Sequence, residues 1–593
     1  MITQMKKYTF LVFHRDYEAF LEQLRSLGVV HITEKASGTA EDATLQSLLQ
    51  QADRLRKTIA QGAPDQLLQE KANVESRIAA TEKEAKAMAV WGDFSAERIE
   101  QLQQAGYSLR FFVCPQKKFE AEWGTEVAVE KGQVYFVVVE KAGEEVEQPE
   151  DLQAYATELT LSKKSSAALL HDVEGLKGLL AAQNARIELW QKEQLPAMEQ
   201  EYKETLQQID WQRVTLNTDT VAEGALKVVE GFCPIDQTAA LDTMLQEQDI
   251  YFQAEDPTEE DNTPIKLRNN WFTKLFEPFT GMYGWPTYGE FDPTPILAPF
   301  YLLFFAMCLG DAGYGLILIL FGLLLHYKKI DIEMFRGQGP VIAVLGAGTT
   351  VVGLVLGTFF GISLFDANWY PAVMKKCILH GEVMGFDVQM VASLAIGVLH
   401  ICLAMVIKAI CFTKRFGLKN NLSTWGWTIL IVGGLILAAV AMALNLPAEV
   451  TKWLVIALAV VSGLGIYIFN KPGRNPIVNV FSGLYDTYNV ASGLIADVLS
   501  YVRLYALGLS GGILGSTFNT LGMMFIGNPE TTNTGLLVLE IVLAIVVLLF
   551  GHVLNILLSS LGAFVHPLRL TFVEYFKNAG YEGKGTMYKP FKK

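Results

Sequence analysis

The chain places an arginine inside apolar sequence twice near its C-terminus, in LIADVLSYVRLYALGLSGGIL (494–514) and in LLSSLGAFVHPLRLTFVEYF (557–576). Arg503 and Arg569 are these two residues. An arginine at the centre of a lipid-spanning helix costs about 2.5–3.5 kcal/mol on insertion scales, so helices keep one where it faces protein or water. A pair on the last two apolar segments predicts an ion path through a membrane. A structural ion pair is the alternative for either residue alone.

The two halves of the chain differ in charge. Residues 1–290 contain 29 Lys and Arg against 48 Asp and Glu, whereas the remainder contains 19 against 14. The length of 593 residues also exceeds that of an ordinary single domain. We therefore expect an acidic cytoplasmic part, 1–290, followed by a membrane domain, 291–593. An acidic surface disfavours nucleic acid as a partner.

The residue types that build common catalytic and metal sites are not grouped in this sequence. The six cysteines form no CxxC pair and no His cluster accompanies them, which favours core thiols over a disulfide framework or a metal site. The motifs GxxxxGK[ST], GxSxG and HExxH are absent, so we expect no nucleotide hydrolysis by this chain itself and no cofactor. The N-terminal apolar stretch is short and soon interrupted by charge, unlike a signal peptide. We expect the N-terminus to stay in the cytoplasm.

The soluble half combines strands with long helices. Runs rich in aromatic and β-branched residues predict strands at 8–13, 109–115 and 134–140, and a strand–helix–strand pattern occurs twice, at 8–33 and 226–254. Two helical stretches, about 40–90 and 155–217, lie between, with Pro64 as a break in the first. The second carries a coiled-coil seam at Leu195, Met198, Tyr202, Leu206 and Ile209. The simplest assembly is an antiparallel coiled-coil hairpin with an αβ lobe at each end, which makes an elongated arm.

The second half contains eight predicted spans. Apolar runs of spanning length lie at about 340–363, 387–412, 423–446 and 450–469. The stretch 294–327 is too long for one helix and is broken at Gly310, Asp311 and Gly313, which predicts two short spans. Two very long segments, about 477–527 and 534–578, close the chain, and their length indicates strongly tilted helices.

The basic residues predict how these spans are oriented. With the N-terminus inside, the outside loops carry little beyond Lys375, Lys376 and Lys452. The inside loops and the tail carry Lys328, Lys329, Arg336, Lys414, Arg415, Lys419, Lys471, Arg474, Lys577, Lys584, Lys589, Lys592 and Lys593. An even number of spans then returns the C-terminus to the cytoplasm.

Polar residues line one face of each of the last two segments. At about 100° per residue, the first stripe spans roughly 80° and the second roughly 100°. The first contains Asp486, Asn489, Gly493, Asp497 and Ser500, with Arg503 beside it; the second contains His552, Asn555, Ser559, Gly562, His566 and Arg569, with Glu540 at its edge. Lipid-facing helices do not carry such stripes, whereas a protein-lined aqueous path does.

Each of these residues also has a structural interpretation. Asp486 and Asn489 are inexpensive if they lie near the membrane surface, and Ser559 can bond the backbone of the preceding turn. His552 is compatible with a packed, neutral histidine, and Pro567 with a helix kink. His400 and Asp311, outside the stripes, are compatible with structural hydrogen bonding.

Several motifs resemble the a/I subunit of rotary V-type and V/A-type ATPases, in the bacterial or archaeal form. They are ADVLSYVRLYALGLSGG (496–512), HPLRLTFVEYFKNAGYEGKG (566–585) with YKPF (588–591), YGEFDPTPILAPFYLLFFAMCLGDAGYG (288–315) and LRSLGVVHI (24–32). The resemblance covers the whole chain, and the parts occur in the right order.

The resemblance implies a fold and partners. It implies eight membrane helices beside a ring of c/K proteolipids, with two offset half-channels between the two long helices and the ring. Arg503 and Arg569 match the family's paired arginines, which attract the ring carboxylate, release its ion and block a direct leak. Peripheral stalk subunits of E and G type would hold the soluble arm as a stator. Where eukaryotic relatives carry a glutamate about three turns before the second arginine, this chain has Ser559.

Two other functions remain open at this point. One is a stand-alone secondary transporter with a coiled-coil regulatory arm, which would need a midplane substrate site and usually inverted repeats. The other is a membrane-anchored scaffold, which the two arginines disfavour. The sequence leaves open whether the ion is H⁺ or Na⁺, because the stripes contain both titratable and neutral polar side chains.

Overall fold

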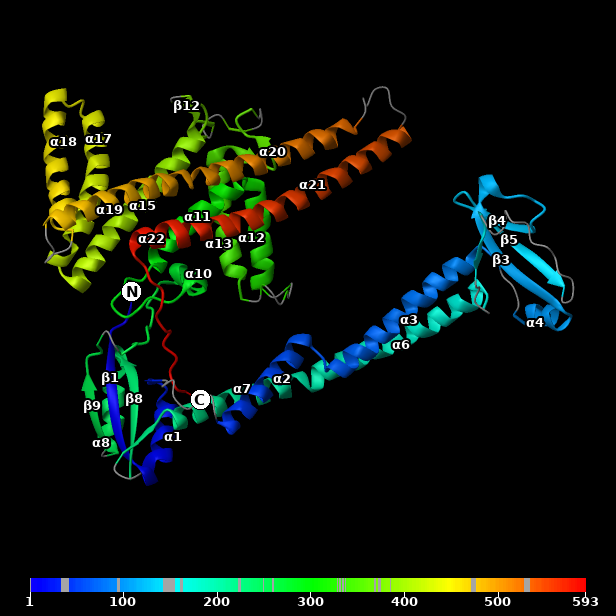
Figure 1. Cartoon of the computed structure of the whole chain (residues 1–593), viewed down its shortest axis with the longest axis horizontal. Helices are drawn as coiled ribbons and strands as arrows, with labels where there is room; N and C mark the ends of the chain where they lie inside the picture. The colour runs from blue at the N-terminus through cyan, green and yellow to red at the C-terminus, as the bar shows by residue number, and fades with distance from the viewer. Residues whose placement is uncertain are drawn as a thin grey trace. The chain divides into compact units, whose positions relative to one another are not determined.

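The computed structural model describes residues 2–33, 42–92, 96–141, 155–159, 164–221, 225–248, 250–258, 261–327, 329, 332, 335, 337–366, 370–371, 375–383, 385–470, 476–526 and 534–592. Lys328, Arg336, Lys471, Arg474 and Lys593, used above for orientation, lie outside these ranges. The chain divides into two compact units, Met1–Thr33 with Asp219–Lys593, and Glu34–Thr218. Figure 1 shows the elements of both. The predicted division at 290 separates a cytoplasmic part from a membrane domain, whereas these two units are separated by their internal contacts. The division at 290 stays a prediction.

An αβ lobe in the first unit joins two distant chain segments. Its antiparallel sheet has the order β2-β8-β1-β9, with β7 also paired to β8. The strands are β1 (Met5–Phe13), β2 (His31–Ile32), β7 (Asp219–Val221), β8 (Leu226–Pro234) and β9 (Tyr251–Glu255). The helices α1 (Tyr17–Leu27) and α8 (Thr238–Glu247) bury Phe20, Leu21, Leu24, Leu241 and Leu245. Both predicted strand–helix–strand patterns are therefore present, and they share one sheet.

The second unit is built on paired helices that run in opposite directions. The helices are α2 (Ala43–Gln61), α3 (Asp65–Ala89), α6 (Ser166–Glu193) and α7 (Leu195–Leu216). Lys177 pairs with Glu82 at 2.8 Å, and Gln191 donates to the Gly62 carbonyl at 3.0 Å, so α6 runs antiparallel to α3. Gln51 donates to Glu201 and Gln212 to Asp42, which gives α2 and α7 the same relation. The break between α2 and α3 falls at Gly62–Pro64, as predicted.

One detail of the predicted seam is wrong. Leu206 is 39% exposed, whereas Thr205 and Ile209 are buried on α7. A step of three from Tyr202 to Thr205 and then four to Ile209 keeps the inward face, and the expected step of four to Leu206 leaves it. Coiled-coil packing of the hairpin stays a prediction.

A small sheet lies where α3 ends and α6 begins. Its antiparallel order is β4-β5-β3-β6. The strands are β3 (Tyr107–Pro115), β4 (Thr125–Glu130), β5 (Gln133–Lys141) and β6 (Thr157–Leu159), and α4 (Ala96–Gln104) precedes them. Trp91 packs its indole edge against Phe111 and Tyr135 of this sheet. The sequence predicted β3 and β5 but missed β4, β6 and α4, which are short or largely polar.

The apolar helices begin with a tight pair. Helix α11 (Thr294–Leu309) ends at Gly310, which has φ of +61° and lies 3.3 Å (from its ideal Cβ position) from the Gly508 Cα. A side chain there would be strained and would meet backbone. Asp311 then caps α12 (Ala312–His326), and α13 (Gly339–Leu356) packs along it. The predicted break of 294–327 into two helices is confirmed.

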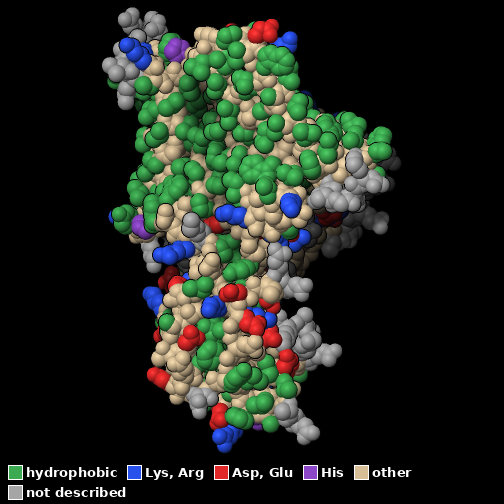
Figure 2. Space-filling view, turned by 90° about the vertical axis from the view of Figure 1, so that its left-hand side faces the viewer, with side chains coloured by type: hydrophobic (Ala, Val, Ile, Leu, Met, Phe, Trp, Pro, Cys, Tyr) green, Lys and Arg blue, Asp and Glu red, His purple; other side chains and the backbone are tan. Residues whose placement is uncertain are grey.

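The next helices are α15 (Val388–Phe416), α16 (Leu422–Thr428), α17 (Gly434–Ala443) and α18 (Ala448–Gly463). Short π-helical turns, Ile429–Gly433 and Leu464–Ile468, follow α16 and α18. Many large apolar side chains on α17 and α18 are exposed, among them Ile436, Met442, Trp453 and Val461. Figure 2 shows the resulting apolar surface, with charged side chains gathered on the αβ lobe. Such a surface suits lipid, because soluble proteins rarely expose apolar patches of this extent.

The chain closes with two long helical segments that lie side by side. The first is α19 (Pro476–Leu499) followed by α20 (Val502–Met524); the second is α21 (Thr534–Arg569), a π-helical turn (Leu570–Tyr575) and α22 (Phe576–Ala579). Figure 1 shows α20 along α21, both crossing the direction of α12, α17 and α18. Among the described residues, six helical segments are long and apolar enough to cross a membrane, and α11 and α12 are shorter apolar helices. The protein is thus a multi-pass membrane protein by composition, and the count of eight spans stays a prediction.

Candidate functional site

Arg503 lies in the first turn of α20, just after a break in the helix. Ser500 and Tyr501 separate α19 from α20, and the Arg503 and Leu504 amides bond back three residues, to Ser500 and Tyr501. This tighter turn replaces one α-helical turn. The Arg503 side chain is half-buried, and its Nη1 is buried without a hydrogen-bond partner among the described residues. A buried guanidinium nitrogen with no partner is costly, which points to a ligand or water at this place.

Arg569 is the last residue of α21 and is exposed. The π-helical turn that follows buries Leu570, Thr571, Glu574 and Tyr575. Both Arg503 and Arg569 lie within electrostatic range of His566 and of Glu574. The two arginines, which were predicted from separate segments, therefore share two neighbours, His566 and Glu574. The His566 Nδ1 is also buried without a partner in the described part of the chain.

The stripe on α19 ends in an ion pair. Asp497, whose side chain is 10% exposed, accepts from Lys577 Nζ at 3.3 Å and from Asn578 Nδ2 at 2.8 Å. Ser500 lies within hydrogen-bonding reach of the Glu574 carboxylate. Further along α19, Asp486 accepts from Asn470 at 2.9 Å, and Asn489 is exposed. Asp497 and Ser500 thus lie next to the break that precedes Arg503, whereas Asp486 and Asn489 lie farther from the arginine along the chain.

The stripe on α21 is joined to its neighbours by a hydrogen-bonded chain. Asn555 Nδ2 donates to the Tyr314 hydroxyl at 2.8 Å, and that hydroxyl bonds His552 Nδ1 at 2.8 Å. His552 Nε2 bonds Asn519 Oδ1 at 3.0 Å. Because Asn519 Oδ1 can only accept, His552 Nε2 carries a proton, and in the neutral ring Tyr314 donates to Nδ1. Ser559 donates to Asn555 Oδ1 at 3.0 Å rather than to the preceding backbone.

Asp311 holds the loop that faces this chain. Its carboxylate accepts backbone N–H groups from Gly313, Tyr314, Phe360 and Gly361 at 2.7–3.2 Å. Four such bonds satisfy a buried carboxylate, so Asp311 has the structural role considered above. It fixes Tyr314 for its contact with His552. Glu540 is half-buried on α21, twelve residues before His552.

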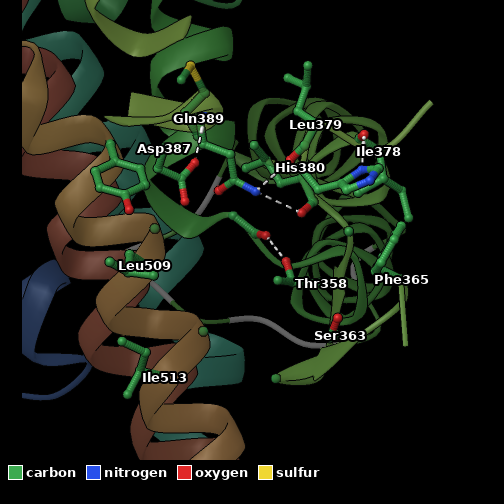
Figure 3. Close-up of a pocket in the computed structure, with 18 of the residues that line it drawn as sticks. Thr358, Ser363, Phe365, Ile378, Leu379, His380, Asp387, Gln389, Leu509 and Ile513 are labelled. Atoms are coloured by element: carbon green, nitrogen blue, oxygen red, sulfur yellow. Dashed lines mark hydrogen bonds between the residues drawn. The ribbon is translucent and has the colours of Figure 1, made fainter. Parts of the chain in front are cut away.

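A cavity of about 420 Å³ opens beside α20, on the side of the β-hairpins that precede α15. These hairpins are β10 (Thr358–Phe359) with β11 (Ile362–Ser363), and β12 (Glu382–Val383) with β13 (Phe386–Asp387). Figure 3 shows Asp387, Gln389, His380 and Thr358 around it, with Leu509 and Ile513 of α20. Gln389 Nε2 donates to the Leu356 and Leu379 carbonyls, both at 3.1 Å, and so fixes the rim. Asp387 caps α15 and lies within hydrogen-bonding reach of Tyr505.

Sequence reasoning did not assign Glu574, Tyr501, Asp387 or Tyr505 to the site. It gave His400 a structural role, and His400 bonds Tyr501 in the structure. Glu574 stood inside a quoted motif, but the helical periodicity of α21 does not continue through the π-helical turn. Asp387 ends the two-residue strand β13 and His380 lies in a loop, and neither position shows periodicity in the sequence. Among the described residues no three His, Cys, Asp or Glu side chains are grouped as a metal centre would need.

Comparisons with known proteins show the family of the chain. A family model described as the V-type ATPase 116 kDa subunit family matches residues 17–373 and 486–593. The chain belongs to this family. Both arginines, and all the stripe residues of α19 and α21 named above, lie in the matched ranges. The resemblance to the a/I subunit is thereby confirmed.

The relatives carry matching names. The V-type ATP synthase subunit I of Borreliella burgdorferi is 27% identical, with all of both chains covered. Its namesake from Treponema pallidum, subunit I 1, is 26% identical over the whole of both chains. The A-type ATP synthase subunit I of Pyrococcus abyssi is 32% identical over 58% of this chain and 49% of its own length. These names confirm the expectation of a non-catalytic membrane subunit of an ATPase complex.

Proposed function

We propose that the protein is the membrane stator subunit of a rotary V/A-type ATPase. It supplies the half-channels through which an ion reaches and leaves a rotating c/K proteolipid ring, and so couples ATP hydrolysis or synthesis to translocation of H⁺ or Na⁺. The single observation that carries this is Arg503, a fixed positive charge in the membrane region with a buried nitrogen that has no hydrogen-bond partner among the described residues. Arginine stays protonated and cannot relay protons by titrating. It can hold a carboxylate on a moving partner and expel that partner's ion.

The surroundings of Arg503 support two separate paths by which an ion could reach it. On one side, Asp497 of α19 and Ser500, which follows α19, lead toward it from the exposed Lys577, and on the other the cavity at Asp387 and Tyr505 lies beside α20. The α15 helix begins at the cavity, and its residue Phe412 contacts Gly580 near Lys577, so the two paths are at opposite ends of α15. With the N-terminus and the C-terminus in the cytoplasm, the cavity belongs to the external path.

The stripe residues of α21 fit this proposal in two ways. His566 and Arg569 lie with Arg503 and complete the charged site. His552 and Asn555 bond to α12 and α20, Ser559 bonds to Asn555 on its own helix, and Glu540 lies farther along α21. We assign His552, Asn555 and Ser559 the task of holding α21 at a fixed distance from α20, beside any part they take in lining the path.

The partners follow from the family. The exposed apolar faces of α20 and α21, with Leu509, Ile513, Leu557 and Leu561, offer surface to the ring and to lipid. The antiparallel arm and its αβ lobes would bind peripheral stalk subunits of E and G type and resist rotation. A rigid stator is needed because the ring can do work on the ion only if the arginine does not turn with it.

Purification of the tagged full-length chain from its native membranes tests this proposal. A ring of small proteolipids and the ATPase subunits should accompany the chain in stoichiometric amounts. Recovery of the chain alone, with transport of a solute by the isolated chain in liposomes, would instead support a secondary transporter. A chain that binds the complex but can be deleted without loss of ion flux would be a scaffold.

A further inference from the structure

Several buried polar atoms without partners lie near Arg503. Among the described residues, His400 Nε2, Tyr575 Oη, Glu574 Oε2 and Arg503 Nη1 are all buried and have no hydrogen-bond partner. The His400 and Tyr575 side chains belong to residues that are fully buried, and Glu574 is 2% exposed. Buried polar groups in native proteins are almost always bonded to protein or to ordered water. Four such atoms in one region therefore call for a shared set of partners.

The contacts show that these residues form one cluster. The His400 ring stacks on the Tyr575 ring with centroids 4.3 Å apart and planes 4° apart, and Phe300 covers its other face at 4.3 Å. Tyr501 bonds His400 Nδ1 at 2.9 Å. Ser500, the neighbour of Tyr501, reaches the Glu574 carboxylate. The cluster thus joins α15, the α19–α20 turn and the π-helical turn after α21.

The π-helical turn is what brings the acid inward. It spans Leu570–Tyr575 and buries Glu574 together with Tyr575. Such turns insert one residue into a helix and often occur at functional sites. Glu574 lies within electrostatic range of both arginines, and one of its carboxylate oxygens has no donor in the part of the chain that the structure describes. A carboxylate kept in such a place without a full set of donors is costly as a purely structural feature.

One end of the cluster reaches solvent. Lys577, whose side chain is 60% exposed, pairs with Asp497, and Asp497 is one turn of α19 before Ser500. The other end is Arg503. A cation that passes Asp497 would next meet the Ser500–Glu574 pair and then the arginine.

We propose that ordered water fills the gaps between Glu574, His400 and Tyr575, and that Glu574 is the carboxylate that exchanges the transported cation, hydronium or Na⁺, between this water and the ring carboxylate that Arg503 holds. The inference rests on the proposed function. It adds a specific ion-exchanging residue that neither polar stripe contains. Tyr501 and His400 are positioning residues, because they orient the water and the Glu574 region without receiving the ion.

The test uses the intact complex. Glu574→Gln keeps the size of the side chain and removes its charge, Glu574→Asp keeps the charge, and Glu582→Gln is the matched control in the exposed tail. Each complex is purified, its assembly is checked by gel filtration, and ATP-driven cation uptake is measured in liposomes. We expect Glu574→Gln to lose at least about tenfold in uptake, Glu574→Asp to retain part of it, and Glu582→Gln to match the parent. Tyr575→Phe, which removes only the unpartnered hydroxyl, should assemble and slow uptake.

A second measurement does not depend on the variants. A cryo-electron microscopy structure of the parent complex that resolves water should show density within hydrogen-bond distance of Glu574 Oε2 and His400 Nε2. A dry cluster would overturn the proposal, and so would normal uptake by the Glu574→Gln complex. If Arg503→Gln abolishes uptake while Glu574→Gln does not, the stator function stands and this inference fails.

Discussion

Gly397 on α15 offers a sharp test of how packing fixes the position of Arg503. A Cβ atom at Gly397 would lie 2.3 Å from Cγ and 2.7 Å from Cβ of Tyr501. Carbon atoms in contact prefer about 3.5–4.0 Å, so the Tyr501 ring would have to move by more than about 1 Å. Tyr501 is fully buried and begins the turn that leads to Arg503. Gly397→Ala should therefore displace Ser500 and Tyr501, which fix the position of Arg503.

The magnitude follows from two contributions. Overpacking a well-filled core costs about 1–3 kcal/mol. The Tyr501–His400 hydrogen bond of 2.9 Å would be strained or lost, which adds about 1 kcal/mol. We expect Gly397→Ala to lower the thermal stability of the purified complex and to reduce ATP-driven ion uptake, although the substitution adds one methyl group and no charge.

Two variants give this experiment its controls. Gly463→Ala also places a methyl group on an apolar helix, but its nearest neighbour is the Tyr467 ring at 3.9 Å, an ordinary contact. It should leave uptake unchanged and should not lower stability, because alanine is a better helix former than glycine. Tyr501→Phe removes only the hydroxyl and should cost about 1 kcal/mol. Parent-like melting and uptake for Gly397→Ala would refute the packing argument around Tyr501.

Three further predictions concern single side chains. His552→Phe removes the hydrogen bonds that His552 makes with Tyr314 and Asn519, so we expect a loss of about 1–3 kcal/mol in stability and slower ion uptake. The coupling ion should stay the same when sodium is varied at constant pH. A switch of coupling ion would place ion selectivity in this chain. Arg569→Ala, at an exposed position, should cause a partial loss of uptake or a leak, smaller than the effect of changing Arg503, and equal or greater severity would reverse the assigned roles. In the αβ lobe, the hydrogen bond from Lys7 at 2.8 Å lowers the pKa of Asp261 to about 2, below the unfolded value of about 3.9. The pair therefore stabilises the lobe above about pH 4 and loses that effect as the pH falls toward 2, so Asp261→Asn should melt earlier than the parent at pH 6 and converge with it near pH 2.

Much of the fold could be predicted from apolar periodicity and from helix-breaking residues. Gly310 and Asp311 marked the α11–α12 turn, because glycine accepts a positive φ and aspartate caps the start of a helix. Pro64 marked the end of the α2–α3 connection, because proline fixes φ and cannot continue a helix. The two arginines could be found because an uncompensated charge in apolar sequence is rare. In each case the energy that decides the structure depends on a residue and its neighbours in sequence.

The rest depends on contacts between distant segments. A continuous helix through Ser500 was assumed in placing the stripe of α19, but the turn at Ser500–Tyr501 breaks it, so the angle of Arg503 to the stripe does not follow from 100° per residue. Glu574 turns inward because of a π-helical turn, and the His400–Tyr501–Tyr575 cluster joins residues more than one hundred positions apart along the chain. Likewise, nothing local in the sequence marks His552 as the partner of Tyr314.

The most direct test of the account is ATP-driven ion uptake by complexes that carry Arg503→Gln. The account predicts a complex that assembles with its proteolipid ring and yet pumps no ion, because glutamine has no charge to hold the ring carboxylate. Arg503→Lys should also pump poorly, since a compact ammonium cannot serve two acceptors as the guanidinium does. Uptake near the parent rate in the Arg503→Gln complex would contradict the account.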